Sequence, residues 1–201
     1  MKVGIVKYNA GNIQSVIYAL NRLGVEPILT DDEAELKSCN KVIFPGVGEA
    51  SSAMKYIRER GLDKIIPNLT QPTLGICIGQ QLMCEHSEEG DVDCLGIFPL
   101  KVKKFPTTNE KGEKLKVPHM GWNAVHLEQD SPLFKGIDKD DFVYYVHSFY
   151  CEYDNDETIA STDYALKYSA SLHKDNFYAV QFHPEKSGKT GQQILKNFLE
   201  L

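Results

Sequence analysis

Residues 73–81 read Thr-Leu-Gly-Ile-Cys-Ile-Gly-Gln-Gln, a short apolar run in which Cys77 has a glycine two residues before it and another two residues after it. This is the cysteine form of the Gly-x-nucleophile-x-Gly elbow, in which a buried strand turns sharply into a helix and exposes the nucleophile. Neighbouring backbone comes very close in such a turn, so a Cβ atom at Gly75 or Gly79 would collide with it. The helix that follows would point its N-terminus at the sulfur, which stabilises a thiolate and supplies N–H groups to an oxyanion.

A buried cysteine is often only a small, inert packing residue, and Gly-x-Cys-x-Gly by itself leaves that alternative open. A second stretch favours the reactive alternative. Residues 179–185 read Ala-Val-Gln-Phe-His-Pro-Glu, a strand-like run that ends at His183 with Glu185 two residues further on. A cysteine nucleophile needs a base and a group that orients the base. The two stretches together predict that Cys77, His183 and Glu185 form a catalytic group.

Length and composition are those of an ordinary globular protein. The chain has 201 residues, of which 42% are hydrophobic and 25% charged, and we expect one domain over residues 1–201. The formal net charge of -6 argues against a general nucleic-acid or anionic-membrane surface. No apolar run approaches the roughly 18 residues of a membrane span, and residues 1–5 read as a first strand rather than a signal peptide. We therefore expect a cytoplasmic protein.

Cysteine usage gives no sign of a structural framework. The five cysteines, at positions 39, 77, 84, 94 and 151, are an odd number and include no Cys-x-x-Cys pair. Neither a disulfide scaffold nor a zinc site is indicated. We expect no cofactor and no metal.

Apolar strands alternate with amphipathic helices in the first half of the chain. Residues 2–6, 25–29 and 41–44 read as strands, and the segment after Asn12 has apolar residues at helical spacing, with Asn12 as a plausible N-cap and Gly24 as a plausible stop. This alternation is typical of a parallel sheet with helices on both faces. We expect an α/β fold, a flavodoxin-like and mainly parallel sheet flanked by helices.

From about Gly96 the pattern changes to many short strands separated by turn residues. These strands predict additional antiparallel strands in the C-terminal half, arranged as a second layer of sheet rather than as a second domain. Their expected ranges are 101–105, 122–127, 142–146, 158–161, 168–172 and 177–182.

A glycine-rich turn follows the strand at 41–44. Residues 45–49 read Pro-Gly-Val-Gly-Glu and should lie at the carboxyl end of the sheet, where open α/β folds place their sites. Two glycines there permit close approach of a ligand, although a plain loop would be the simpler interpretation without the elbow. His147, at a strand end, could also line a site.

Three further motifs carry a family resemblance. Residues 118–123 (Pro-His-Met-Gly-Trp-Asn), 144–148 (Tyr-Tyr-Val-His-Ser) and 181–187 (Gln-Phe-His-Pro-Glu-Lys-Ser) accompany the elbow and the glycine-rich turn in a fixed order. The chain resembles the class I glutamine amidotransferases and, more narrowly, the glutaminase subunits of imidazole glycerol phosphate synthases. The resemblance runs from Tyr8 into the C-terminal segment, and three motifs in the right order are far more specific than one.

The resemblance implies a role for each matching position. Cys77 would attack the side-chain amide of glutamine, His183 would be the base and Glu185 its orienting carboxylate. A thioester on Cys77 would follow the loss of ammonia, and water would release glutamate. Backbone N–H groups of Val47 and Ile78 would bind the oxyanion. The positions implied to bind glutamine are Gly46, Gly48, Gln81, Glu89, His147 and Ser148.

The resemblance also implies a partner. In that family the ammonia passes to a separate (β/α)8-barrel subunit, which makes imidazole glycerol phosphate and aminoimidazole carboxamide ribotide in histidine biosynthesis. This chain has neither the length nor the repeated strand-helix units of such a barrel, so we expect a heterodimer. The positions implied to face the barrel are Asn12, Met120, Trp122, Tyr144 and Lys186.

Alternatives remain open at this point. A paralogous amidotransferase could keep the whole glutaminase site and serve another acceptor, such as a surface-polysaccharide sugar. A non-catalytic binding subunit could retain the fold, although the presence of all three triad members argues against it. A cysteine peptidase on a similar scaffold is disfavoured by Gln81 and Glu89.

Overall fold

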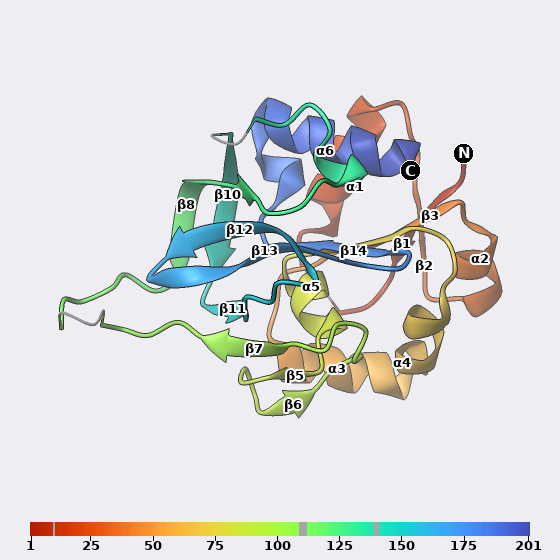
Figure 1. Cartoon of the computed structure of the whole chain (residues 1–201). Coiled ribbons are helices and arrows are strands. Elements are labelled where there is room, and N and C mark those ends of the chain that lie inside the picture. Colours follow the sequence, from red (N-terminus) through yellow and green to blue (C-terminus); the bar gives the residue numbers. More distant parts are fainter. Residues whose placement is uncertain (10, 109–111, 139–140) are drawn as a thin grey trace.

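A 12-stranded sheet runs through the centre of the molecule, with helices above and below it (Figure 1). The structure is a computed structural model, and it describes residues 1–9, 11–108, 112–138 and 141–201. The strands of this sheet are β1 Val3–Val6, β2 Ile28–Thr30, β3 Lys41–Phe44, β4 Thr73–Ile76, β5 His86–Ser87, β6 Val92–Asp93, β7 Lys101–Lys104, β9 His126–Leu127, β11 Phe149–Cys151, β12 Thr158–Tyr164, β13 Leu166–Lys174 and β14 Phe177–Val180.

The first part of the sheet is parallel. Its strands lie in the order β2-β1-β3-β4-β14, and every neighbouring pair among them is parallel. This is the flavodoxin-like order, in which the second strand crosses to the outer edge and the later strands are added on the other side. The prediction of a flavodoxin-like, mainly parallel sheet flanked by helices is therefore confirmed.

Helices cover both faces of the sheet because each presents one apolar stripe to it. On one face, α1 and α6 pack with the core cluster that contains Leu20 and Phe198. On the other face, α3, α4 and α5 pack with a second cluster that contains Met54 and Leu82. The helices are α1 Ile13–Arg22, α2 Glu33–Ser38, α3 Ala50–Glu59, α4 Leu62–Ile65, α5 Ile78–Met83 and α6 Gly188–Glu200, with 3₁₀ turns at Ile66–Asn68, Pro132–Phe134 and Pro184–Lys186.

The expected bounds of α1 hold, but its expected cap does not. Gly24, at φ 77°, follows the end of the helix as predicted. Asn12 occupies the N-cap position with a left-handed φ of 64°, and its side chain makes no capping hydrogen bond. The amide group instead contacts two side chains, Ser15 and Glu185. Asn12 is therefore not a capping residue, because its side chain is committed to a long-range contact.

The antiparallel strands of the C-terminal half are present, but the expectation of a second layer was wrong. Strand β14 pairs in parallel with β4 on one side and antiparallel with β13 on the other. Strands β13, β11 and β7 therefore extend the central sheet instead of covering it. The two-residue strands β5 and β6 complete that edge, and their length is too short to leave a periodic signal in the sequence.

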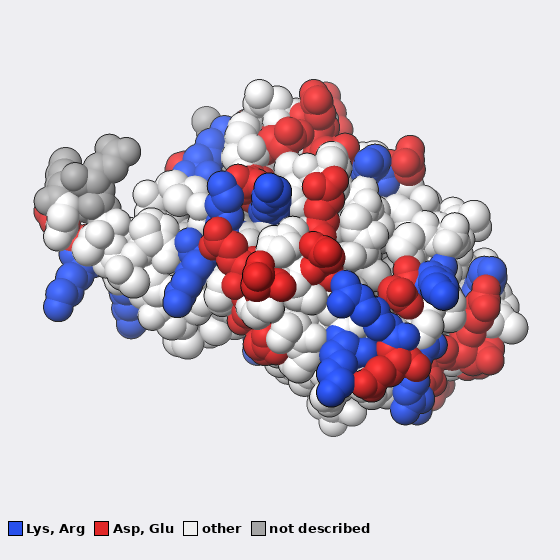
Figure 2. All heavy atoms as spheres, turned by 90° about the horizontal axis from the view of Figure 1, so that it is seen from below, with Lys and Arg blue, Asp and Glu red and all other residues white. Residues whose placement is uncertain are grey.

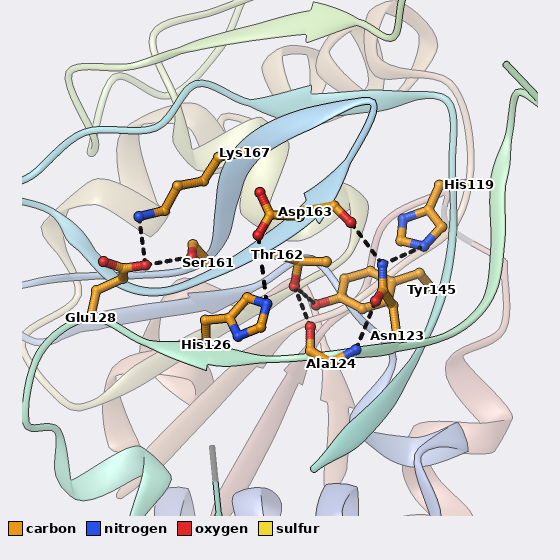
Figure 3. A network of polar contacts seen from close by, with 10 residues as sticks. All are labelled: His119, Asn123, Ala124, His126, Glu128, Tyr145, Ser161, Thr162, Asp163 and Lys167. Carbon is orange, nitrogen blue, oxygen red and sulfur yellow. Dashed lines mark hydrogen bonds and ion pairs between the residues drawn. The ribbon is translucent and has the colours of Figure 1, made fainter. Parts of the chain in front are cut away.

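Only the pair β8 (His119–Ala124) and β10 (Phe142–His147) stands apart from the central sheet within the described ranges. Side-chain contacts join this antiparallel pair to strand β12 (Figure 3). The Asn123 amide donates to the Asp163 carbonyl at 3.1 Å, and the Thr162 hydroxyl donates to the Ala124 carbonyl at 3.0 Å. Tyr145 reaches the same Thr162 hydroxyl at 2.6 Å. The two-stranded ribbon is thus fixed to the sheet by polar contacts as well as by packing.

Charges of both signs are intermingled on the side of the molecule where α3 and α4 lie (Figure 2). Acidic and basic side chains alternate on this face, so its described residues form no broad area of one sign. Among the residues that the structure describes, no helix is both long and apolar enough to cross a membrane.

Candidate active site

The elbow forms between β4 and α5, with Cys77 at the turn. Cys77 has φ 54° and ψ -108°, a backbone conformation that L-residues rarely adopt and that persists only when its surroundings enforce it. A Cβ atom on Gly79 would lie 1.9 Å from the Phe44 carbonyl oxygen, and one on Gly75 would lie 3.0 Å from the Gln80 nitrogen. The predicted steric requirement for both glycines is confirmed.

His183 lies beside the elbow because β14 is the parallel neighbour of β4. Val180 is paired with Ile76, and the Cys77 N–H donates to the Val180 carbonyl at 2.8 Å. The segments that follow the two strands therefore leave the sheet at the same edge. His183 Nδ1 lies 2.7 Å from Glu185 Oε1, and both side chains are only 1% exposed. The structure thus brings the three predicted triad residues together.

Electrostatics favour a positively charged imidazole. Burial by itself would lower the pKa of His183, but Cys77 and Glu185 outweigh it and raise that pKa to about 10. The imidazole is then protonated at neutral pH and lies beside Cys77. No described residue forms a hydrogen bond with His183 Nε2, so this nitrogen is available for proton transfer.

Asn12 adds a fourth side chain to the triad. Its Nδ2 donates to Glu185 Oε1 at 3.0 Å, the same oxygen that faces His183. The Ser15 hydroxyl donates to Asn12 Oδ1 at 2.6 Å, which fixes the orientation of the amide. Glu185 Oε2 is buried and has no partner among the described residues. Asn12 therefore orients the carboxylate that orients His183.

A pocket opens beside Cys77 at the carboxyl end of the sheet. Gln81 and Glu89 line this pocket, and the Glu89 carboxylate accepts a hydrogen bond from the Ala50 N–H at 2.9 Å. Burial raises the pKa of Glu89. Of the positions implied to bind glutamine, only Gly46 lies outside this lining. The lining residues are Val47, Gly48, Cys77, Ile78, Gln81, Glu89, Val146, His147, Ser148 and Phe149.

The glycine-rich turn forms another part of the wall. Gly46 and Gly48 have φ values of 152° and 154°, which only glycine adopts readily. The Val47 carbonyl accepts a hydrogen bond from the Gly11 N–H at 3.0 Å, so the turn is tied to the segment before α1. Ile78 is the first residue of α5, and its N–H has no acceptor within that helix.

A directional chain of hydrogen bonds runs from the pocket to β8. The Phe149 carbonyl can only accept, so His147 Nδ1 carries the proton across their 2.7 Å contact. Burial lowers the pKa of His147 to about 3, so its Nε2 is bare and accepts from the Tyr168 hydroxyl at 3.2 Å. That oxygen then accepts from His119 Nδ1 at 3.2 Å. His119, whose pKa burial lowers to about 4, faces the Asn123 amide (Figure 3).

The residues expected to face a partner fall into two groups. Met120 and Trp122 are 56% and 55% exposed on β8, and the Trp122 ring meets that of Tyr144 edge-on at 6.0 Å. Lys186 is exposed and lines a cavity of about 310 Å³ that Glu185 also lines. Asn12 differs from these four, since its side chain points to the triad.

Two residues with contacts in the site were absent from the sequence-based set. Gln181 is fully buried, and its Nε2 lies 3.8 Å from Cys77 Sγ. Tyr168 holds the His147 ring, as described above. Gln181 stands two residues before His183, a position that could have drawn attention to it, whereas nothing in the sequence near Tyr168 points to a site.

Comparison with known proteins identifies the family. The model of the class I glutamine amidotransferase family matches residues 5–201. The chain belongs to the class I glutamine amidotransferases. Among curated members, it is 58% identical over 205 residues to the imidazole glycerol phosphate synthase subunit HisH of Bacteroides thetaiotaomicron, with 100% of both chains covered. It is 47% identical over 196 residues to HisH of Mannheimia succiniciproducens, with 98% of both chains covered.

Solved structures of other proteins share the fold. A putative GMP synthase subunit from Thermoplasma acidophilum superposes with a TM-score of 0.76 at 22% identity, covering 100% of this chain and 92% of that one. The structure of PurLQS from Thermotoga maritima gives a TM-score of 0.71 at 18% identity, covering 99% and 97%. At such identities the likeness concerns the fold alone.

Proposed function

We propose that this amidotransferase hydrolyses glutamine to glutamate and ammonia through a thioester on Cys77, as the glutaminase subunit of an imidazole glycerol phosphate synthase. The observation that carries the proposal is the position of Cys77, held in a strained elbow beside the buried His183–Glu185 pair. A strained, solvent-shielded nucleophile next to a charged imidazole is the arrangement that acyl transfer requires.

The first half of the reaction forms the thioester and uses the positive charge of the His183 imidazolium. The Cys77 thiolate attacks the amide carbon of glutamine, and the oxygen of the tetrahedral intermediate becomes negative. Ile78 N–H, at the start of α5, and Val47 N–H, in the glycine-rich turn, are the proposed donors to that oxygen. Removing a donor of this kind costs about 3 kcal/mol of barrier. The imidazolium of His183 gives its proton to the leaving nitrogen, ammonia departs, and the thioester remains.

The second half releases glutamate. His183 is neutral after its proton has left with ammonia, so it can take a proton from a water molecule that attacks the thioester carbon. Taking that proton restores the imidazolium, and collapse of the second tetrahedral intermediate then expels the Cys77 thiolate and the γ-carboxylic acid of glutamate, which loses its proton to water. Glu185 and Asn12 act only by orienting the ring, since neither contacts the reacting atoms.

The substrate contacts follow from the lining of the pocket. The Glu89 carboxylate is placed to accept from the α-amino group of glutamine, and the Gln81 amide oxygen is a second acceptor. The segment at His147 and Ser148 also lines the pocket, and its backbone groups are the proposed partners of the α-carboxylate. Gly48 leaves room for the substrate, since no atom lies within 4 Å of the Cβ position there.

The ammonia would be consumed by a second subunit. The curated relatives are named as subunits of imidazole glycerol phosphate synthase, which implies a cyclase partner. We propose a (β/α)8-barrel subunit bound as a heterodimer. Met120 and Trp122 supply exposed apolar surface for it, with Tyr144 and Lys186 beside them.

The alternatives are weaker. The reported relatives, at 58% and 47% identity over essentially the full length, carry the HisH name, so a paralogue that serves another acceptor is not favoured. A binding subunit without catalysis would have no use for a strained cysteine beside a charged histidine. A peptidase is disfavoured by Gln81 and Glu89, which line the pocket beside Cys77 and suit a single amino acid.

A coupled assay with the purified chain and a histidine-pathway barrel subunit tests the proposal. Glutamate release should require Cys77 and rise when the barrel and its acceptor are present. Cys77→Ala should abolish it, whereas Cys94→Ala, which removes a cysteine outside the pocket, should not. Glutamine hydrolysis that persists in Cys77→Ala would overturn the proposed function.

A further inference from the structure

Gln181 and Cys77 follow neighbouring parallel strands at the same edge of the sheet. Val180, the last residue of β14, is paired with Ile76, the last residue of β4, so the residues that come next lie side by side. Gln181 is fully buried, and its amide nitrogen is 3.8 Å from Cys77 Sγ. A buried amide must find polar partners, and here one of them is the sulfur.

The hydrogen-bond network settles which end of the Gln181 amide faces the sulfur. Gln81 Nε2 lies 2.9 Å from the Phe149 carbonyl, which can only accept, so this atom is the nitrogen of Gln81. The same nitrogen lies 3.0 Å from the Gln181 side chain, which must therefore present its oxygen there. The Gln181 nitrogen is left facing Cys77. The orientation of the Gln81 amide therefore fixes the orientation of the Gln181 amide.

We propose that Gln181 is a further catalytic residue, whose amide N–H donates to the Cys77 thiolate and keeps the nucleophile charged between turnovers. The inference rests on the proposed function, because a stable thiolate matters only if Cys77 is the nucleophile. Charge-assisted hydrogen bonds are about twice as strong as neutral ones, so this donor favours the thiolate over the thiol. A neutral donor stabilises the charge without adding a second cation beside His183.

The other groups described near the sulfur, His183 and Tyr8, do not supply this neutral hydrogen-bond donor. His183 supplies the positive charge, and its elevated pKa of about 10 depends on Cys77 and Glu185 after burial has lowered it. The buried Tyr8 hydroxyl donates to the Pro45 carbonyl at 2.5 Å, so its proton is already used. Burial and the nearby Cys77 raise the pKa of Tyr8, which keeps that side chain neutral. Gln181 is therefore the neutral side-chain donor that the described contacts place at the sulfur.

Alkylation of Cys77 tests the role without requiring glutamine. Iodoacetamide reacts with the thiolate, so its rate at Cys77, followed on the full chain by peptide mass spectrometry across pH, reports the charged fraction. Gln181→Met removes the donor at nearly constant volume. Gln80→Met is the matched control, because Gln80 is an equally buried amide on the same helix as Gln81 whose nitrogen donates to the Ser169 carbonyl at 3.0 Å.

We expect Gln181→Met to move the midpoint of Cys77 alkylation up by about one pH unit, so that alkylation is about tenfold slower at pH values well below the wild-type midpoint, and to lower kcat for glutamine without a matching rise in KM. Gln80→Met should leave the midpoint unchanged. If Gln181→Met does not fold, Gln181→Glu decides, since it keeps the acceptor for Gln81 but places an oxygen at the sulfur and should slow alkylation further. Equal midpoints for wild type and both Gln181 variants would overturn the inference.

The two proposals can fail separately. A chain that hydrolyses glutamine through Cys77 but shows no shift in Gln181→Met refutes the role of Gln181 and leaves the proposed function standing. A chain that shows the shift but never releases glutamate refutes the function and leaves the thiolate contact established.

Discussion

Asn12 Nδ2 lies 3.0 Å from Glu185 Oε1, although the two residues are 173 positions apart in the chain. The contact joins the N-cap position of α1 to the carboxylate that orients His183. Because Asn12 adopts φ 64°, a conformation that asparagine tolerates better than most residues, the backbone delivers the amide to the triad. A residue expected at a partner interface therefore also supports the catalytic triad.

Replacing Asn12 by glycine should lower kcat. Glycine tolerates the left-handed backbone, so Asn12→Gly removes the amide without adding strain. Loss of one hydrogen bond to a charged group costs about 1.5–3 kcal/mol, which corresponds to a decrease of roughly tenfold to a hundredfold if it is expressed fully in the transition state. Steady-state glutaminase kinetics with the barrel partner would measure it.

Ser15→Ala is a milder version of Asn12→Gly, since it leaves the Asn12 amide in place but frees it to rotate. We expect a smaller decrease in kcat than for Asn12→Gly. Full activity in Asn12→Gly would show that the carboxylate needs no second donor.

The rate of glutamine hydrolysis should fall on the alkaline side, near pH 10. The imidazolium of His183 must give its proton to the leaving ammonia, and its pKa is raised to about 10. Glu185 contributes to that rise, so Glu185→Gln should lower the pKa of His183 and move the alkaline limb to lower pH, with some activity retained. An alkaline limb at the same pH in both proteins would show that the carboxylate does not act on the imidazole charge.

Gly79→Ala should prevent the elbow from forming. The added Cβ atom would lie 1.9 Å from the Phe44 carbonyl oxygen, which belongs to the backbone of a central strand and cannot move away cheaply. We expect a loss of several kcal/mol in the free energy of unfolding, within the range typical of overpacked cores, together with loss of activity. Urea denaturation would measure the first. A variant as stable as the wild type would mean that α5 can shift away from β3.

The free energy of unfolding should decrease between pH 6.5 and pH 5. Burial lowers the folded-state pKa values of His147 and His119 to about 3 and about 4, so in this window the unfolded chain binds more protons than the folded one. Each histidine then costs about 1.5 kcal/mol over the window, or about 3 kcal/mol together. His183 works in the opposite sense, because its raised pKa gives a contribution that is already complete below pH 6.5 and therefore constant here.

His119→Gln separates the two contributions, since it should remove about half of the decrease. Urea titrations at several pH values would show it. An unchanged slope in that variant would contradict the assignment of His119 as a neutral buried histidine.

Local patterns were sufficient to predict the elbow and the parallel strands in the first half of the chain. Gly75 and Gly79 flank Cys77 because of contacts within a few residues, and the run that ends at His183 is a strand whose carboxyl end lies beside that of β4. The parallel pairing of these two strands was not predicted, because residues 177–182 were expected among the antiparallel strands of a second layer, and only the types of Cys77, His183 and Glu185 indicated that they lie together.

Long-range pairing could not be predicted in the same way. The contact of Asn12 with Glu185 depends on how α1 packs against the turn before α6, and the local signal at Asn12 indicated a helix cap. The antiparallel strands were expected in a separate layer because their sequences carry the period of a strand but not the identity of its neighbour. Strand β13 pairs with β14 because β14 presents the free edge of the central sheet.

Acid quenching of the working enzyme tests whether glutamine is converted through a covalent bond to Cys77. Wild-type chain with its barrel partner and acceptor would be mixed with glutamine, quenched within one turnover and digested for peptide mass spectrometry. We expect a γ-glutamyl group on the peptide that contains Cys77, absent from Cys77→Ala and from samples left to complete the reaction. Glutamate formation without that adduct on Cys77, or with equal rate in Cys77→Ala, would contradict that expectation.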